Sequence, residues 1–339
     1  MITKEMVKCI LLILLLILLL GIFIIQVVGL LVSTPSSAST TPSSASTPIL
    51  VNVSHPNSTT IYTGSPALTQ PFIFFHQRKS GGSKIRDEIM AAAKAIEAPT
   101  FIPCVTPNLG CETYYTPENG DFPPPIPTVY GGHIHYNTFI QTLYVLHNVP
   151  KLKVQISPPP PKFTCFTIFR EPISRIQSCW NYRFIQTNPV KKSREQIHKL
   201  ADMPTTNLTS QLTSARSKYG KGCLNEPMRI FSDFGQDEPI VNNLAGADLG
   251  IAELALNQTV ERAGQCVVGI LERCADTKLV IEKHLPFFAP YFSCDHQENT
   301  GKVEKGALSD DHLAILQELG RFEIRAYEQA NLLLDAQIM

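Results

Sequence analysis

The stretch from Pro71 to Ala98 most narrows the folds open to this chain, because a strand, a glycine loop and a helix follow one another there. Its run of residues Phe72 to Phe75 is aromatic and β-branched, which is typical of a strand buried on both faces. Gly81 and Gly82 let the backbone turn sharply, and Ser83 with the Ala-rich segment behind it predicts a capped helix. The stretch therefore predicts a buried strand that leads through a tight loop into a helix.

The same loop has the composition of an anion site. The first N–H groups of a helix are unpaired and carry the positive end of its macrodipole, and Lys79 and Lys84 flank them here. Together these groups favour a bound phosphate or sulfate. A short glycine-rich turn is a weak signal, so an ordinary strand–helix turn with two exposed lysines remains open on loop composition alone.

The residues before this stretch predict a membrane anchor and a stem. Cys9 to Val32 is an almost unbroken apolar run of 24 residues, which is long enough to span a bilayer and longer than the apolar core of a cleaved signal peptide. Lys4 and Lys8 precede it and no Lys or Arg follows until Arg78, so the positive-inside bias places the N-terminus in the cytosol. We expect a cytoplasmic tail at 1–8, a transmembrane signal anchor at 9–32, a Ser/Thr/Pro-rich stem at 33–70 and a lumenal domain at 71–339.

Cysteine usage fits a secretory compartment. Beyond Cys9 the chain has eight cysteines, an even number that predicts disulfides. Cys104 and Cys111 are the nearest local pair, whereas the pairing of the others cannot be read from the sequence. The absence of repeated C-x-x-C spacing argues against a zinc site. The formal net charge is zero, so no whole-protein field favours nucleic acid.

Later apolar runs extend the strand–helix pattern. Phe163–Phe169 and Gln265–Ile270 predict two further strands, each followed by an amphipathic helical segment, and Ser309–Ala336 predicts a long capped helix. Strands that alternate with helices predict an α/β fold with a central, mostly parallel sheet flanked by helices. Ligands of such sheets bind at the carboxyl ends of the strands, where Lys79 and Arg170 would lie.

Two further segments carry candidate chemistry. In Val129–Asn137 an extended backbone would place His133 and His135 on one face, and each histidine fits either a hydrogen-bonded core residue or a catalytic base. Arg170 ends a predicted strand and is well placed to hold a phosphate, although it could instead pair with Glu171 or a neighbouring acid. Ser178 follows about two turns into the next helix, where it could also be a neutral helix residue.

Charge is distributed unevenly between 188 and 261. Residues 188–221 hold seven basic residues against two acids, whereas 226–261 hold seven acids against Arg229 alone. A solvated charged surface explains both segments, and a groove for an acidic polymer explains the first one better.

Four segments in order resemble the membrane-bound carbohydrate sulfotransferases. HQRKSGGSKI (76–85) resembles their 5′-phosphosulfate loop, and TIFREPISRIQSCWNYRF (167–184) resembles their 3′-phosphate motif. GGHIHYNTF (131–139) is similar to the histidine segment of the uronyl 2-O-sulfotransferases. VVGILERCADT (267–277) is similar to a late segment of the heparan 2-O and 6-O group. The resemblance spans most of 72–336 but is slight from 187 to 259.

The resemblance implies a P-loop-like sulfotransferase fold and the donor 3′-phosphoadenosine 5′-phosphosulfate, with no metal. It implies an acidic, glycosaminoglycan-like glycan acceptor and a type II protein of the Golgi membrane; the oligomeric state is left open. His133 aligns with the family's catalytic histidine, and Arg170 and Ser178 with the residues that hold the 3′-phosphate. The residues implied to line the 5′-phosphosulfate are Lys79, Ser80, Gly81, Gly82, Ser83 and Lys84.

Departures from the family pattern keep two alternatives open. Ser80 stands where the family has Thr, Glu171 stands where it has Asp, and Gly131 stands where the 2-O enzymes have a further histidine. The position that is sulfated therefore stays open, and His135 competes with His133 as the base. A second alternative is a catalytically inactive cell-surface protein of the same fold that binds nucleotide and glycan. A P-loop kinase is disfavoured, because the G-x-x-x-x-G-K-[ST] spacing is missing.

Overall fold

The computed structural model describes residues 68–102, 128–140, 162–187, 200–294 except 215, 218, 219 and 221, and 306–339. The expected tail and anchor, most of the stem at 33–70, and the expected pair Cys104 and Cys111 lie outside these ranges. Within them, no helix is long and apolar enough to cross a membrane.

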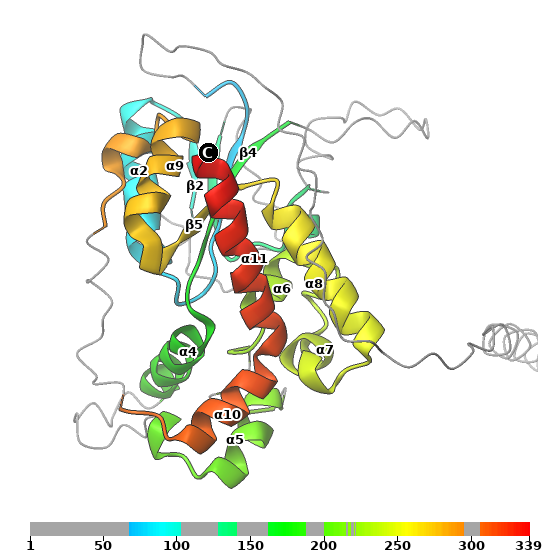
Figure 1. The fold of residues 1–339 in the computed structure, drawn as a ribbon. Coiled ribbons are helices and arrows are strands. Elements are labelled where there is room, and N and C mark those ends of the chain that lie inside the picture. The colour runs from blue at the N-terminus through cyan, green and yellow to red at the C-terminus, as the bar shows by residue number, and fades with distance from the viewer. Residues whose placement is uncertain are drawn as a thin grey trace, which may run out of the picture. The chain divides into compact units, whose positions relative to one another are not determined.

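Five described strands form one parallel sheet, in the spatial order β2-β3-β1-β4-β5 (Figure 1). The strands are β1 (Phe72–Phe75), β2 (Thr100–Phe101), β3 (Val129–Gly132), β4 (Thr164–Phe169) and β5 (Val267–Ile270). This arrangement confirms the predicted α/β class with a parallel sheet and flanking helices. The strands that follow β1 in sequence, β2 and β3, lie on one side of it, and the later strands β4 and β5 lie on the other. β1 therefore lies at the topological switch point, where such sheets bind ligands at the carboxyl ends of their strands.

Helices cover both faces of the sheet. They are α2 (Gly82–Ala95), α4 (Pro172–Thr187), α5 (Thr205–Thr213), α6 (Glu226–Phe231), α7 (Glu238–Asn242), α8 (Leu249–Ala263), α9 (Cys274–His284), α10 (Asp310–Leu319) and α11 (Arg321–Ile338). Short 3-10 turns are η4 (Leu200–Asp202), η5 (Leu244–Gly246), η6 (Leu271–Arg273) and η7 (Ala289–Tyr291).

Side chains of β1 alternate between two cores, as a strand buried on both faces requires. Phe72 and Phe74 pack with apolar residues of α2 and α9. Ile73 and Phe75 pack on the opposite face with residues of α6, α8 and α11. All four side chains are fully buried, which confirms the predicted strand and fixes the direction in which its carboxyl end points.

A third core lies away from the sheet. Ile176, Cys179 and Trp180 of α4 pack there with leucines of α5 and α10. Because α4 starts directly after Arg170, this helical cluster is attached to the carboxyl end of β4. Helix α4 therefore lies beside the carboxyl ends of β1 and β4.

Three disulfides are present among the described residues. Cys165–Cys266 joins β4 to the residue before β5, Cys179–Cys223 joins α4 to the segment before α6, and Cys274–Cys294 joins the start of α9 to the chain beyond η7. The expectation of disulfides is thereby confirmed, and their pairing is a finding that the sequence did not contain.

Two predicted helix details were wrong. Helix α2 is capped by Gly81 rather than Ser83, because Gly81 adopts the left-handed conformation (φ 78°) and the helix already starts at Gly82. The predicted helix at 309–336 begins at its Ser309 cap but breaks at Gly320. Glycine is a poor helix former, and here the two halves contribute to different cores, α10 to that of α4 and α5 and α11 to those of the sheet and of α8.

Candidate functional site

The loop between β1 and α2 has an unusual backbone. Lys79 (φ 65°) and Gly81 (φ 78°) both lie in the left-handed region. Glycine adopts that conformation without strain, whereas a lysine there costs about 1 kcal/mol or more. Non-glycine residues in this region concentrate at ligand sites and persist only where the surroundings hold them.

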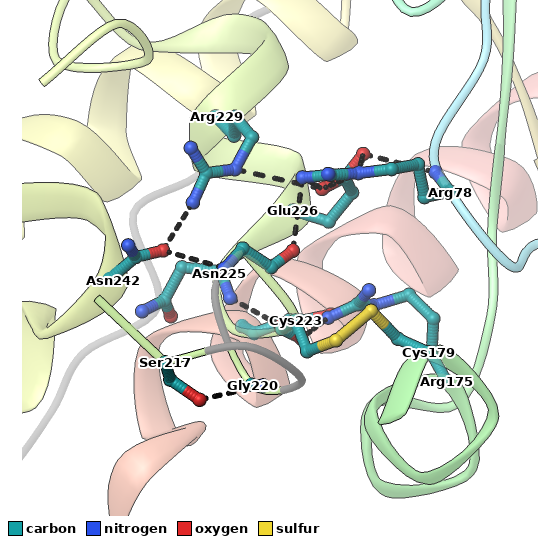
Figure 2. The surroundings of a disulfide bond; sticks show 12 residues. Arg78, Arg175, Cys179, Ser217, Gly220, Cys223, Asn225, Glu226, Arg229 and Asn242 are labelled. Carbon is teal, nitrogen blue, oxygen red and sulfur yellow. Dashed lines mark hydrogen bonds and ion pairs between the residues drawn. A yellow bond between two sulfur atoms is a disulfide. The ribbon is translucent and has the colours of Figure 1, made fainter. Parts of the chain in front are cut away.

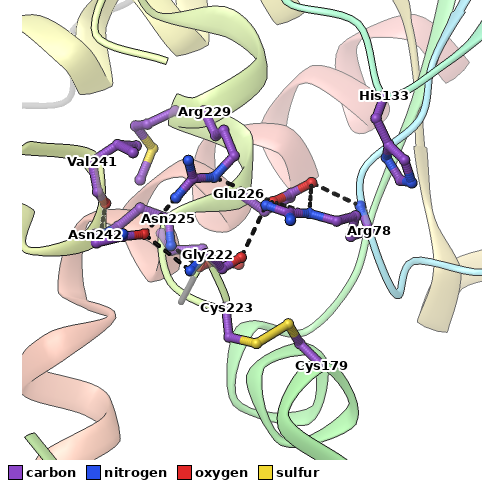
Figure 3. Close-up of polar contacts among 12 residues, drawn as sticks. Arg78, His133, Cys179, Gly222, Cys223, Asn225, Glu226, Arg229, Val241 and Asn242 are labelled. Carbon is purple, nitrogen blue, oxygen red and sulfur yellow. Dashed lines mark hydrogen bonds and ion pairs between the residues drawn. A yellow bond between two sulfur atoms is a disulfide. The ribbon is translucent and has the colours of Figure 1, made fainter. Parts of the chain in front are cut away.

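Arg78 holds the loop in this conformation through contacts with Glu226 and Gly222. Its Nη2 lies 2.6 Å from Oε2 of Glu226, its Nε lies 2.9 Å from both carboxylate oxygens, and its backbone N–H donates to Oε1 at 3.1 Å (Figure 3). Nη2 also donates to the carbonyl of Gly222. Burial opposes ionisation of the Glu226 carboxyl, but the charges of Arg78, Arg175 and Arg229 outweigh it and lower the pKa of Glu226 to about 2. The loop is thus tied to the first residue of α6.

The segment that accepts these hydrogen bonds, from Gly222 to Glu226, is itself held on several sides (Figure 2). Cys223 is bonded to Cys179 of α4, and its carbonyl accepts a hydrogen bond from Arg175 at 2.6 Å. Arg175 forms a fully buried ion pair with Glu323 of α11. On the other side, Asn242 accepts from the backbone of Gly222 at 3.1 Å. Movement of the segment would disturb all of these contacts, so Arg78 is bound to a rigid partner.

Lys79 and Arg170 meet at the carboxyl ends of β1 and β4. Nη1 of Arg170 donates to the carbonyl of Lys79 at 2.8 Å, and Nζ of Lys79 lies 4.1 Å from the ring centre of Tyr182 on α4. Tyr182 is 46% exposed. A cation held over an aromatic ring gains about 0.5–1 kcal/mol at such an exposed site, which an anionic ligand can readily exceed. Lys79 therefore lies at the strand ends, with its ammonium group over the Tyr182 ring and its carbonyl bonded to Arg170.

The predicted loop residues differ widely in exposure. Ser80 is fully buried, and within the described part of the chain its Oγ has no hydrogen-bond partner. Ser83 is exposed and its Oγ lies 3.5 Å from Nη2 of Arg86, while Lys84 is partly buried in the first turn of α2. A buried hydroxyl without a partner is destabilising by about 1–3 kcal/mol, a cost that a ligand bound at Ser80 would remove.

The predicted 3′-phosphate residues lie on one strand–helix connection. Arg170 follows β4 directly, and Ser178, partly buried, lies about two turns into α4. The carboxylate of Glu171 accepts from the backbone N–H groups of Ile173 and Ser174, at 2.9 and 2.6 Å. Glu171 therefore caps α4. Burial lowers the pKa of Arg170, and the charges of Glu272 and, more weakly, Glu171 act in the opposite direction.

His133 and His135 bond to different elements, because β3 ends at Gly132 and the backbone is no longer extended beyond it. Nδ1 of His133 lies 2.9 Å from the carbonyl of His76, at the carboxyl end of β1. Nδ1 of His135 lies 2.6 Å from the carbonyl of Arg229 on α6, and His135 is only 8% exposed. The extended backbone on which a shared face depended is therefore absent at these residues, and His133 is the histidine that adjoins the loop.

Electrostatics keep His133 neutral. Burial lowers its pKa to about 4, Glu226 acts in the opposite direction, and Arg78 lowers the pKa further. Burial also lowers the pKa of His135. Because a carbonyl only accepts hydrogen bonds, Nδ1 of His133 must carry the proton in the neutral ring, and Nε2 is then the nitrogen with the lone pair.

The sequence analysis did not identify four residues that shape this site. They are His76, Tyr182 and the paired residues Arg78 and Glu226. Arg78 and Glu226 are 148 residues apart and no local pattern connects them. His76 could have been noticed, because it is the first residue after the predicted strand and precedes the basic loop.

The basic segment at 188–221 is mostly outside the described residues; Arg216, the described member of its basic set, is exposed. The described residues contain no group of three or more His, Cys, Asp and Glu side chains placed to hold a metal ion.

Comparison with models of known protein families and with curated proteins gives no match to this chain.

Proposed function

We propose that this chain transfers a sulfuryl group from 3′-phosphoadenosine 5′-phosphosulfate to a hydroxyl group of an acidic glycan. The four resembling segments support the donor, and the P-loop-like sulfotransferase version of the α/β fold belongs to this proposal. The observation that carries it is the β1–α2 loop. At the switch point of the sheet this loop combines a left-handed Lys79, a buried Ser80 hydroxyl that has no hydrogen-bond partner among the described residues, and the N-terminus of α2.

Each donor group has a place in this proposal. The 5′-phosphosulfate lies against the N–H groups of the loop and of the first turn of α2, with Lys79 and Lys84 beside it and Ser80 as a further donor. The 3′-phosphate lies against Arg170 and Ser178. Arg170 already touches the Lys79 carbonyl, so the two phosphate sites would share one rigid edge of the sheet.

His133 is the proposed base. Its Nε2 takes the proton of the acceptor hydroxyl as the hydroxyl oxygen forms a bond to sulfur. The bond from sulfur to the 5′-phosphate oxygen breaks, and adenosine 3′,5′-bisphosphate leaves with the electron pair. Lys79 and the loop N–H groups stabilise the negative charge on that oxygen. A pKa of about 4 makes a weak base, and the negative charges of a bound donor would raise it toward neutrality.

His135 is not the proposed base, because its ring is buried against α6 and Gly235 and its hydrogen bond joins it to Arg229 of α6, whereas His133 is bonded to the residue that begins the β1–α2 loop. It is better suited to fixing α6, which carries Glu226. The open choice between the two histidines is therefore made for His133 within this proposal.

The test is transfer of radioactive sulfate from the labelled donor by the purified chain. His133→Ala and Lys79→Ala should each lose transfer by at least about 100-fold while they fold normally. Lys94→Ala is the matched control, because Lys94 is an exposed lysine in the last turn of the same helix; it should keep transfer within about twofold. Full activity of folded His133→Ala would remove His133 from the mechanism, whereas nucleotide binding without transfer would favour the inactive binding protein.

A further inference from the structure

His76 occupies the junction between the β1–α2 loop and His133. It is the first residue after β1 and is 4% exposed. Its ring lies between two others: the ring centres of His76 and His133 are 4.2 Å apart with planes at 24°, and those of His76 and Phe74 are 5.5 Å apart with planes at 12°. The His133 imidazole therefore has a flat neighbour on one face, which restricts rotation of its ring.

The backbone of His76 restrains the same ring by its edge. The carbonyl of His76 accepts from Nδ1 of His133 at 2.9 Å. This bond selects the neutral form protonated at Nδ1, which is the less common form of a free histidine. One residue thus contacts His133 in two independent ways, through its ring and through its carbonyl.

The His76 ring is in turn fixed by α2. A Cβ atom added to Gly82 would lie 1.8 Å from Cδ2 and 1.9 Å from Nε2 of His76. The ring therefore fills the space that any other residue would need at the first position of the helix. Glycine is therefore required at position 82 to make room for the His76 ring. Because that ring contacts both α2 and the His133 ring, a shift of α2 would also displace His133.

We propose that His76 is a positioning residue for His133, which holds its imidazole in one tautomer and one orientation and shields it from water. Its role in catalysis rests on the function proposed above, but the restraint on His133 is a property of the free protein. His76 begins the β1–α2 loop and also contacts His133, so the residue that starts the proposed anion-binding loop also positions the proposed base.

Charged groups face this pair from three elements. Arg78 and Lys79 belong to the loop, Arg86 to α2 and Glu226 to α6. Burial lowers the pKa of His76 well below its usual value, and the three basic side chains and His133 act in the same direction. His76 therefore stays neutral together with His133, and the stack does not carry two adjacent positive charges at neutral pH.

The test is a nuclear magnetic resonance titration of the full chain with ¹⁵N-labelled histidine, assigned with His76→Gln and His133→Gln. In the unmodified chain, His133 should titrate near pH 4 and carry its neutral-form proton on Nδ1. His76→Ala should raise the pKa of His133 by about 1 unit or more, because water then reaches the ring. It should also mix the two tautomers, because the unstacked ring can rotate away from the backbone carbonyl that every variant at position 76 retains. His76→Phe keeps a flat ring at this position, so it should preserve both signatures.

Gly82→Ala provides an independent perturbation, because it displaces the His76 ring without altering either histidine. It should shift the His133 pKa in the same direction as His76→Ala. If His76→Ala does not fold, His76→Leu replaces it, since leucine fills most of the space but cannot stack. An unchanged tautomer and pKa of His133 in the folded variants would overturn the proposal.

Activity gives the second readout. The acidic limb of the kcat/KM profile for transfer from the labelled donor should move up by the same ~1 unit in His76→Ala, and kcat should fall by about tenfold or more. If the chain transfers no sulfate at all, the function proposed above fails, while the resonance titration still decides the restraint on His133. If transfer occurs and the titration shows no change in the His76 variants, the restraint alone fails.

Discussion

The Arg78–Glu226 ion pair is the contact on which the loop most depends. Glu226 is fully buried and the Arg78 side chain is 12% exposed. Removal of one partner from such a pair leaves a buried charge uncompensated, and this usually costs about 3–5 kcal/mol. The geometry of the loop is therefore bound to the overall stability of the domain.

Arg78→Ala should lower the free energy of unfolding by about 3 kcal/mol, measured by urea denaturation. Arg325→Ala is the matched control, because Arg325 forms an exposed ion pair with Glu253, for which the loss should be under about 1 kcal/mol. Equal small losses in both variants would show that the buried pair does not hold the loop.

The acid sensitivity of folding follows from two pKa values. A histidine whose pKa falls from 6.5 to about 4 on folding disfavours the folded state below 6.5, so stability should rise from pH 4 to pH 6.5 and level off above it. The Glu226 carboxyl, with its pKa lowered to about 2, stabilises the fold above pH 4.5 and loses that contribution as the pH falls toward 2.

Urea denaturation at a series of pH values measures this dependence. His133→Gln should reduce the slope of stability between pH 4 and 6.5, and Glu226→Gln should reduce the slope below pH 4.5. A slope that both substitutions leave unchanged would assign the acid sensitivity to other groups.

Residue chemistry at the site was only partly readable from the sequence. Lys79, Ser80 and Arg170 could be predicted near one another because they follow two strands of a parallel sheet. The difference between His133 and His135 could not, since it depends on where β3 ends and on which carbonyl each ring meets. Likewise Glu226 lies in an acidic segment whose composition predicts only a solvated surface, yet it is fully buried.

At the scale of elements, the position of the segment from Gly222 to Glu226 depends on its disulfide bond to α4. The bond between Cys179 and Cys223 closes a loop with a sequence separation of 44. The chain-entropy estimate for such a loop is about 4 kcal/mol. The same segment carries Gly222 and leads into Glu226, which both hold Arg78.

The double variant Cys179→Ser, Cys223→Ser should therefore lose up to about 4 kcal/mol of stability and also weaken binding of adenosine 3′,5′-bisphosphate. Cys274→Ser, Cys294→Ser is the control, because that bond closes a shorter loop (sequence separation 20) beside α9. It should lose somewhat less stability, about 3 kcal/mol, and leave nucleotide binding unchanged when measured by calorimetry under folding conditions. Equal effects of the two pairs on nucleotide binding would contradict the link from α4 to the loop.

Element prediction succeeded where local patterns are strong. The aromatic run before the loop and the two later apolar runs became β1, β4 and β5 within one or two residues of the expected bounds. The cap of α2 and the break at Gly320 were missed, because both depend on packing. Gly82 must leave room for His76, and α10 and α11 must reach different cores.

At the scale of the whole molecule, the order of the strands gathers the site. Because β1 lies between β3 and β4, the three strand ends bring His133, the basic loop and Arg170 to one edge of the sheet. The sequence predicted a parallel sheet but not this order, which is set by crossovers. The pairing of the disulfides was equally unreadable, since it too follows from the tertiary arrangement.

Incubation of the purified full chain with ³⁵S-labelled 3′-phosphoadenosine 5′-phosphosulfate and a panel of acidic and neutral glycans, followed by linkage analysis of the product, tests the central claim most directly. We expect label on a hydroxyl group of an acidic glycan, with His133→Ala at least about 100-fold slower. Absence of transfer to every glycan by folded chain that binds adenosine 3′,5′-bisphosphate would contradict the proposed reaction, and strong preference for neutral glycans would contradict the acidic acceptor.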